Sequence, residues 1–261
     1  MSGISLPIQR KFGETSRSDR WWIPPLLVLL GLSSFIIYST WAALQGANYH
    51  YGPYLSPFYS PELWGNSPHA WFGKLPSWLP GWFSPAILIL WAPAGFRVTC
   101  YYYRGAYYKG FWADPPACAV GEPHKSYSGE SRWPLIIQNI HRYFLYFALI
   151  FILILSWDAL RSYWFADGVG IGVGSLVLTV NVVLLSGYTF GCHSLRHLIG
   201  GRIDCISQSP ACHRAYKCSS FFNGRHMLWA WMSLCSVMFA DVYVRLCAMD
   251  IWHDRHIILF R

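Results

Sequence analysis

The sequence predicts an all-α integral membrane protein with five transmembrane helices and an external cap rich in aromatic residues and proline. Only 12% of the residues are charged, whereas 54% are hydrophobic and 18% are aromatic. Soluble domains carry about 25% charged residues, so this composition points to the bilayer. Five apolar runs are near or above the roughly 20 residues that a spanning helix needs. They cover residues 23–44, 85–108, 134–157, 170–199 and 226–248.

The five runs differ in how clearly they predict a helix. The run 23–44 follows a long preface that contains Arg and Lys, which favours a retained helix over a cleaved signal peptide. The run 85–108 is the most polar, and Pro93 and Gly95 interrupt it. The run 170–199 is expected to begin in the sequence GVGIGVG, because small residues allow close packing between membrane helices.

The remaining segments fit a single membrane domain over residues 23–261, preceded by a cytoplasmic segment, 1–22. The stretch 46–83 is rich in Pro, Tyr and Trp, and amphipathic aromatic side chains prefer the membrane interface. We therefore expect an ordered cap on the external side, with a short surface helix at 61–66.

The net charge of +8 reflects topology rather than nucleic-acid binding. In a five-helix arrangement, 13 of the 20 Lys and Arg residues fall on one side and five on the other. Positive residues accumulate on the cytoplasmic side, which predicts a cytoplasmic N-terminus and an external C-terminus. The 13 residues are Arg10, Lys11, Arg17, Arg20, Arg104, Lys109, Lys125, Arg132, Arg196, Arg202, Arg214, Lys217 and Arg225; the five are Lys74, Arg161, Arg245, Arg255 and Arg261.

Metal-binding side chains recur at one depth of three predicted helices. Cys100 lies about 15 Å from the cytoplasmic end of its helix, His141 about 10 Å, and Cys192 and His193 about 10–12 Å, at 1.5 Å per residue. His193 and His197 are spaced i, i+4 and share a helix face. Such groups are costly in hydrocarbon, so they indicate a functional site. We expect a redox centre held in a membrane anchor.

The residues leave the identity of that centre open. Haem b would need two histidines from facing helices, such as His141 with His193 or His197. A Rieske-type [2Fe–2S] cluster needs two cysteines and two histidines, which Cys100, Cys192 and two of the three histidines would supply. The usual C-x-H and C-x-x-H spacings are absent. A non-redox membrane scaffold or transporter is the alternative from another class.

Several unusual strings resemble the membrane-anchor subunit of actinobacterial-type succinate dehydrogenase, a class of respiratory complex II with a five-helix anchor. They are NYHYGPYLSPFYSPELWG, FRVTCYYYRGAYYKGFW, PPACAV, NIHRYFLY, GCHSLRHLIGGR and RHMLWAW, and they extend over nearly the whole chain. One departure is Leu195, where the family pattern CHSCRH has a cysteine. The resemblance implies a bacterial plasma-membrane protein that assembles with a flavoprotein subunit and an iron–sulfur subunit.

The resemblance also implies the cofactors. It favours a membrane-embedded Rieske-type [2Fe–2S] cluster over haem b, with electrons passing to menaquinone or ubiquinone. The expected ligands come from Cys100, Cys192, His141, His193 and His197, with Cys118 in reserve. The expected quinone-binding residues are Arg97, Tyr101, Arg196, His226 and Trp229.

Overall fold

The computed structural model describes residues 11–80, 83–124, 131–133, 135–201 and 203–261. Arg10, Lys125, Pro134 and Arg202, which entered the predictions above, lie outside these ranges. The chain divides into two compact units, Met1–Ile36 with Val98–Asn139 and Ile37–Arg97 with Ile140–Arg261. Most of the candidate site belongs to the second unit.

Four helical segments in the described residues are long and apolar enough to cross a membrane. They are α1 (Ile23–Gln45), the segment Leu135–Arg161 made of the 3-10 helix η2 (Leu135–Ile140) and α4 (His141–Arg161), α5 (Val173–Phe190) and α8 (His226–Ala248). A shorter apolar helix, α2 (Ile87–Val98), adds to them. The mostly helical membrane fold is therefore confirmed, whereas the count of five spans stays a prediction.

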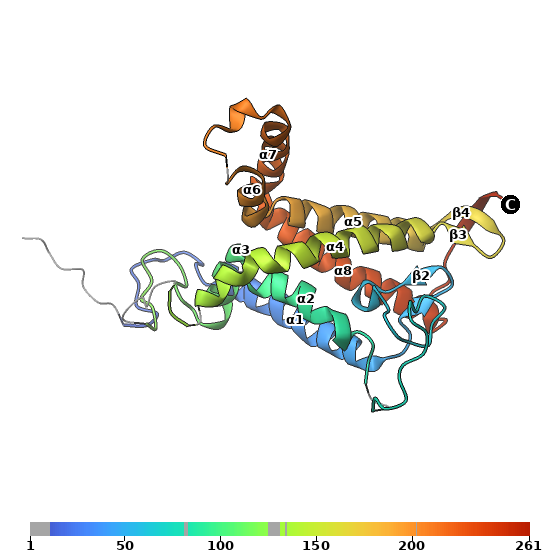
Figure 1. The fold of residues 1–261 in the computed structure, drawn as a ribbon. Coiled ribbons are helices and arrows are strands. Elements are labelled where there is room, and N and C mark those ends of the chain that lie inside the picture. The colour runs from blue at the N-terminus through green and yellow to red at the C-terminus, as the bar shows by residue number, and fades with distance from the viewer. Residues whose placement is uncertain (1–10, 81–82, 125–130, 134, 202) are drawn as a thin grey trace, which may run out of the picture. The chain divides into compact units, whose positions relative to one another are not determined.

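The second unit is built around α4, α5 and α8, which pack side by side (Figure 1). Ala159, Leu178, Ala240 and Val244 are buried where these helices meet. The two alanines allow close helix approach, because small side chains bring the backbones together. Outward-facing residues such as Leu153, which is 72% exposed, remain apolar and suit contact with lipid.

The cap folds onto one end of this bundle. The hairpin strands β1 (His50–Tyr51) and β2 (Tyr54–Leu55) pair antiparallel, and the 3-10 helix η1 (Pro57–Tyr59) follows. These elements contact α4 and α8. The expected surface helix at 61–66 is wrong: those residues form bends, and the side chain of Glu62 is buried within them. Glu62 accepts hydrogen bonds from Tyr49, at 2.7 Å, and from Ser67.

A second sheet, which the all-helical prediction missed, lies at the same end of the unit (Figure 1). Strands β3 (Trp164–Phe165), β4 (Gly168–Gly172) and β5 (His256–Phe260) pair antiparallel in that order. The glycine run expected to open a helix instead forms β4, and α5 begins only at Val173. Glycines suit this strand because β5 lies against it: a Cβ on Gly170 would approach the carbonyl oxygen of Ile257 to 2.5 Å.

Two expected helices are each interrupted at a cysteine. The run 85–108 forms α2 and α3 (Tyr101–Phe111), and Cys100 takes an extended conformation at the start of α3. The chain stays helical at Pro93 and breaks after Val98. The run 170–199 contains α5 and α6 (His193–Gly200), with Cys192 in the extended break between them. Helix α7 (Pro210–Asn223) then packs against α6.

The first unit contains the beginning of α1, the helix α3 and the segment that follows it. The backbone of Gly110 in α3 packs against Leu29 in α1, since a Cβ at Gly110 would lie 3.2 Å from the Leu29 nitrogen. Backbone hydrogen bonds join residues 13 and 14 to Gly121. Arg17 donates to the carbonyl oxygen of Cys118 at 3.1 Å. The N-terminal segment is thus folded against the 112–124 segment.

Candidate functional site

The buried part of the candidate site is centred on a thiol and an imidazole. The Nε2 atom of His141 and the Sγ atom of Cys192 lie 3.1 Å apart, and both side chains are almost fully buried. His141 is the first residue of α4, and Cys192 precedes α6. In a membrane protein a buried polar group needs a partner, and each of these two supplies one to the other.

The break after α5 brings Cys192 to this position. The chain leaves the helix at Gly191, where an added Cβ would lie 2.9 Å from the carbonyl oxygen of Gly187 and 3.0 Å from the carbonyl carbon of Phe222. Both of these atoms are backbone, so they have little room to move away. Asn223 donates to the carbonyl oxygen of Gly191 at 2.7 Å and holds the break in place. Only glycine fits between these backbones, which explains why a glycine directly precedes Cys192.

Aromatic rings connect His141 to a second histidine, His226, which is partly buried. Phe96 stacks on His141 with ring centres 4.6 Å apart and planes 8° apart. Phe96 also meets Tyr188 edge to face at 5.5 Å, and Tyr188 stacks on His226 at 5.0 Å. Through this stacking His226 belongs to the same layer as His141 and Cys192, although its side chain is only partly buried.

A cation completes this layer. The guanidinium carbon of Arg97 lies 4.9 Å from the ring centre of Tyr188, a cation–π distance. Arg97 also donates to the Ser233 hydroxyl at 3.1 Å. Trp229 packs nearby on Gly187, where a Cβ would reach the indole ring at 2.6 Å. Among the described residues the indole nitrogen of Trp229 has no hydrogen-bond partner.

His193 and His197 form a separate pair outside the buried layer. Their Nε2 atoms lie 3.0 Å apart, and the pair is solvent-exposed. Burial lowers the pKa of His193, and His197 and Arg196 lower it further. A cavity of about 220 Å³ opens here, lined by His193, Arg196, His197, Gly200, Gly201 and Tyr216. Arg196 is held by Tyr216 at 2.7 Å and by Asn223 at 3.0 Å.

The candidates from sequence are thus distributed over several places. His141 and Cys192 come together, His193 and His197 form their own pair, and Cys100, Tyr101 and Cys118 belong to the other unit. Cys100 is buried, whereas Cys118 is exposed. Within the described ranges, no group of three or more His, Cys, Asp or Glu side chains is arranged to hold a metal ion.

Sequence reasoning missed two members of the buried layer. Phe96 and Tyr188 connect the two histidines, but a single aromatic residue in an apolar helix carries no signal that separates it from ordinary packing.

The fold and the buried donors define a multi-pass membrane subunit with a polar layer inside its helices. A family profile described as "Actinobacterial succinate dehydrogenase subunit SdhC" matches residues 23–250, and the chain belongs to this family. It is a membrane-anchor subunit of succinate dehydrogenase, an oxidoreductase that reduces quinone, as the sequence predicted.

A solved structure agrees with this assignment. The chain is similar to a chain of the "Mycobacterium smegmatis Sdh1 complex in the apo form", with 44% identity and a TM-score of 0.86. The alignment covers 95% of this chain and 96% of the other. A comparison with proteins of curated function gave no match. Membership of a complex supports the expected association with the flavoprotein and iron–sulfur subunits.

Proposed function

We propose that this anchor relays electrons from the iron–sulfur subunit of succinate dehydrogenase, through a redox centre within the membrane, to menaquinone or ubiquinone. The observation that carries the proposal is the buried contact between His141 and Cys192. Thiolate and imidazole are the ligands that iron takes in Rieske-type centres. A histidine is costly to bury inside a membrane domain, so His141 needs a partner there, and the partner it contacts is a second side chain that binds metals.

The donors fit a Rieske-type [2Fe–2S] cluster in their chemistry. Cys192 and His141 would supply one thiolate and one imidazole. His226 is the best second imidazole because it stacks on Tyr188 in the same layer. Cys100, which the sequence predicted as the second cysteine ligand, is buried at a helix break in the other unit. A bound cluster would supply a one-electron carrier whose mixed ligation raises its potential above that of all-cysteine clusters.

This assignment changes two of the ligands expected from the sequence. His193 and His197 were candidates because His193 lies at the depth of Cys192 and shares a helix face with His197, but their side chains pair with each other in an exposed position. His226 was expected to contact quinone, and its stacking on Tyr188 supports a place within the buried layer. Cys118 is exposed and remains the weaker alternative to Cys100.

Arg97 is the best candidate for contact with quinone. It is a cation within the membrane domain, and it lies on the Tyr188 ring beside the histidines. An Arg N–H could donate to a quinone carbonyl oxygen and stabilise the charge that develops on reduction. Trp229, with its free indole N–H in the described structure, would offer a second donor.

We also propose the orientation that the charge distribution predicts, in a bacterial plasma membrane. The N-terminus and the α6–α7 segment would face the cytoplasm, and the cap and C-terminus would face outward. This orientation puts the His141–Cys192 layer near the side where succinate is oxidised. Reporter fusions at residues 11 and 261 would test it, because only an external C-terminal fusion supports a reporter that folds outside the cell.

The redox proposal is tested on the purified complex with Cys192→Ser and His141→Ala. We expect both variants to lose a Rieske-like EPR signal and two iron atoms per complex, together with quinone reduction. Succinate oxidation by a soluble dye should persist. Cys247→Ser, which alters another buried cysteine, is the matched control. Variants that assemble and keep full iron content and quinone reduction would overturn the proposal, and a sharp reduced α-band would replace the cluster with haem b.

A further inference from the structure

The exposed histidine pair on α6 has the geometry of a small metal site. His193 and His197 stand one turn apart on the same helix face, and their Nε2 atoms are 3.0 Å apart. Two nitrogens that share a tetrahedral zinc ion, each at 2.0–2.1 Å, lie about 3.4 Å apart. A shift of a few tenths of an ångström would therefore let one ion bind both nitrogens.

We propose that His193 and His197 bind a divalent transition-metal ion, such as Zn²⁺ or Cu²⁺, at a site separate from the proposed redox centre. The two imidazoles would be the only protein ligands, and water or an external anion would fill the other positions. Imidazole suits Zn²⁺ and Cu²⁺, whereas Mg²⁺ and Ca²⁺ prefer oxygen ligands. The site should therefore take the transition metals selectively.

The surroundings of the pair leave room for such an ion. The cavity of about 220 Å³ lies directly beside both rings. Gly201 forms part of its lining, and a Cβ there would lie 2.6 Å from the carbonyl oxygen of His197, so this part of the lining carries no side chain.

Among the described residues that line this cavity, Arg196 is the cation that opposes a metal ion. Its guanidinium group is held on the side of α7 by Tyr216 and Asn223, with its carbon 5.0 Å from the Tyr216 ring centre. It is thus fixed rather than free to enter the ligand position. A cation held at this place would favour an anion, such as hydroxide or a carboxylate, in the open coordination positions of the metal.

The site is tested by titrating the intact complex with Zn²⁺ and Cu²⁺, comparing wild type with His193→Ala and His197→Ala. Loss of a partner that only orients a ligand already weakens metal binding about 10–100-fold, so loss of a ligand should cost at least about tenfold. We expect each variant to bind one ion fewer in the micromolar range. The Cu²⁺ form of the wild type should show two imidazole nitrogens by pulsed EPR. Millimolar Mg²⁺ should not compete.

The controls separate this inference from the redox proposal. His253→Ala removes an exposed histidine beyond the opposite end of α8 and should leave the titration unchanged. Iron content and the Rieske-like EPR signal should be unchanged in the two α6 variants, whose side chains are exposed. Wild-type metal binding in either variant would overturn the inference. Loss of iron in either variant would also overturn it, because the histidines would then belong to the redox centre.

Discussion

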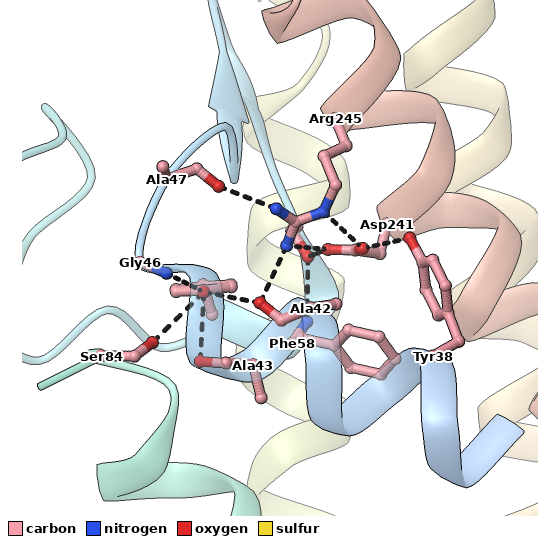
Figure 2. Close-up of polar contacts among 11 residues, drawn as sticks. Tyr38, Ala42, Ala43, Gly46, Ala47, Phe58, Ser84, Asp241 and Arg245 are labelled. Carbon is pink, nitrogen blue, oxygen red and sulfur yellow. Dashed lines mark hydrogen bonds and ion pairs between the residues drawn. The ribbon is translucent and has the colours of Figure 1, made fainter. Parts of the chain in front are cut away.

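Asp241 and Arg245 form a buried ion pair one turn apart on α8, with 3.0 Å between the Asp241 Oδ2 and Arg245 Nε atoms (Figure 2). Asp241 also accepts hydrogen bonds from the hydroxyl groups of Tyr38, at 2.6 Å, and Ser56. The carboxylate is therefore fully engaged, and its role inside the helix is to join α1, the cap and α8.

Arg245 extends the connection to the end of α1. It donates to the carbonyl oxygens of Ala42 at 3.0 Å and Ala47 at 2.8 Å. The last carbonyl groups of a helix have no partner within it, and a cation is favourable at that end. Tyr59 donates to the carbonyl oxygen of Ala42 as well, at 2.8 Å. A buried arginine thus caps α1 from another helix.

Removing either member of this ion pair should destabilise the complex. Breaking a buried pair leaves one charge without compensation and costs about 3–5 kcal/mol. Asp241→Asn and Arg245→Met should each lower the melting temperature of the purified complex strongly, and the double variant should lose less than the sum. Thermal unfolding of all four proteins measures this coupling. Strictly additive losses would show that the two side chains do not act as a pair.

A larger side chain at Gly174 should destabilise the protein, because the cap residue Tyr54 packs on this glycine. A Cβ at Gly174 would lie 2.5 Å from the Tyr54 ring, which is fully buried and held by Asp254 at 2.7 Å. The ring cannot turn away, so Gly174→Ala should cost about 1–3 kcal/mol through overpacking. Gly105→Ala is the matched control, since a Cβ there meets nothing within 4 Å. Thermal unfolding of both variants makes the comparison, and equal melting temperatures would contradict the expectation.

The sequence predicted the helices that depend on hydrophobicity alone. The runs 23–44 and 226–248 are almost the same as α1 and α8, because a long apolar segment in a membrane has few alternatives to a helix. The prediction failed where contacts between backbone segments that are distant in the sequence determine the conformation. The run GVGIGVG reads as a packing motif of membrane helices, yet β5, about 90 residues later, pairs with it and makes it a strand.

The candidate site was predicted in its chemistry but not in its grouping. Cys192 and His193 were predicted to lie at one depth of a single helix, with His197 on the same face as His193. The break at Gly191 and Cys192 instead sends the cysteine inward and leaves the two histidines outside. A break that depends on the backbone of Phe222 cannot be read from helical periodicity. His226 was expected from the sequence to bind quinone, but its connection to His141 depends on the tertiary packing of Phe96 and Tyr188.

The cap should become less stable at acid pH because of His50. Burial lowers the pKa of His50 from 6.5, and His69 lowers it further, whereas Glu62 opposes the shift. Below about pH 6.5 the unfolded chain therefore binds more protons at this position than the folded chain. The free energy of unfolding should therefore decrease as the pH is lowered below this value. His50→Gln should make the melting temperature less dependent on pH between about 7.5 and about 5.5, a range that includes the ordinary histidine pKa.

The control for His50 is His253→Gln, which alters an exposed histidine and should leave the pH dependence as in the wild type. A His50→Gln protein whose melting temperature falls with acid as steeply as that of the wild type would show that another group is responsible.

Arg97 should matter for quinone reduction more than for assembly. Its hydrogen bond to Ser233 and its contact with the Tyr188 ring hold the guanidinium in one place. Hydrogen bonds to charged groups contribute about 1.5–3 kcal/mol, so Arg97→Gln should lower kcat/KM for quinone about tenfold or more. Arg97→Lys should recover part of the loss, because the charge returns without the planar donor fork.

Arg142→Gln, which removes an arginine whose described contact is with the exposed Tyr143 ring, is the matched control. Steady-state assays with succinate and either a quinone or a soluble dye separate the effects: a role in binding or reducing quinone lowers only the first activity. Equal losses of both activities in Arg97→Gln, or wild-type quinone kinetics in that variant, would exclude Arg97 from the quinone site.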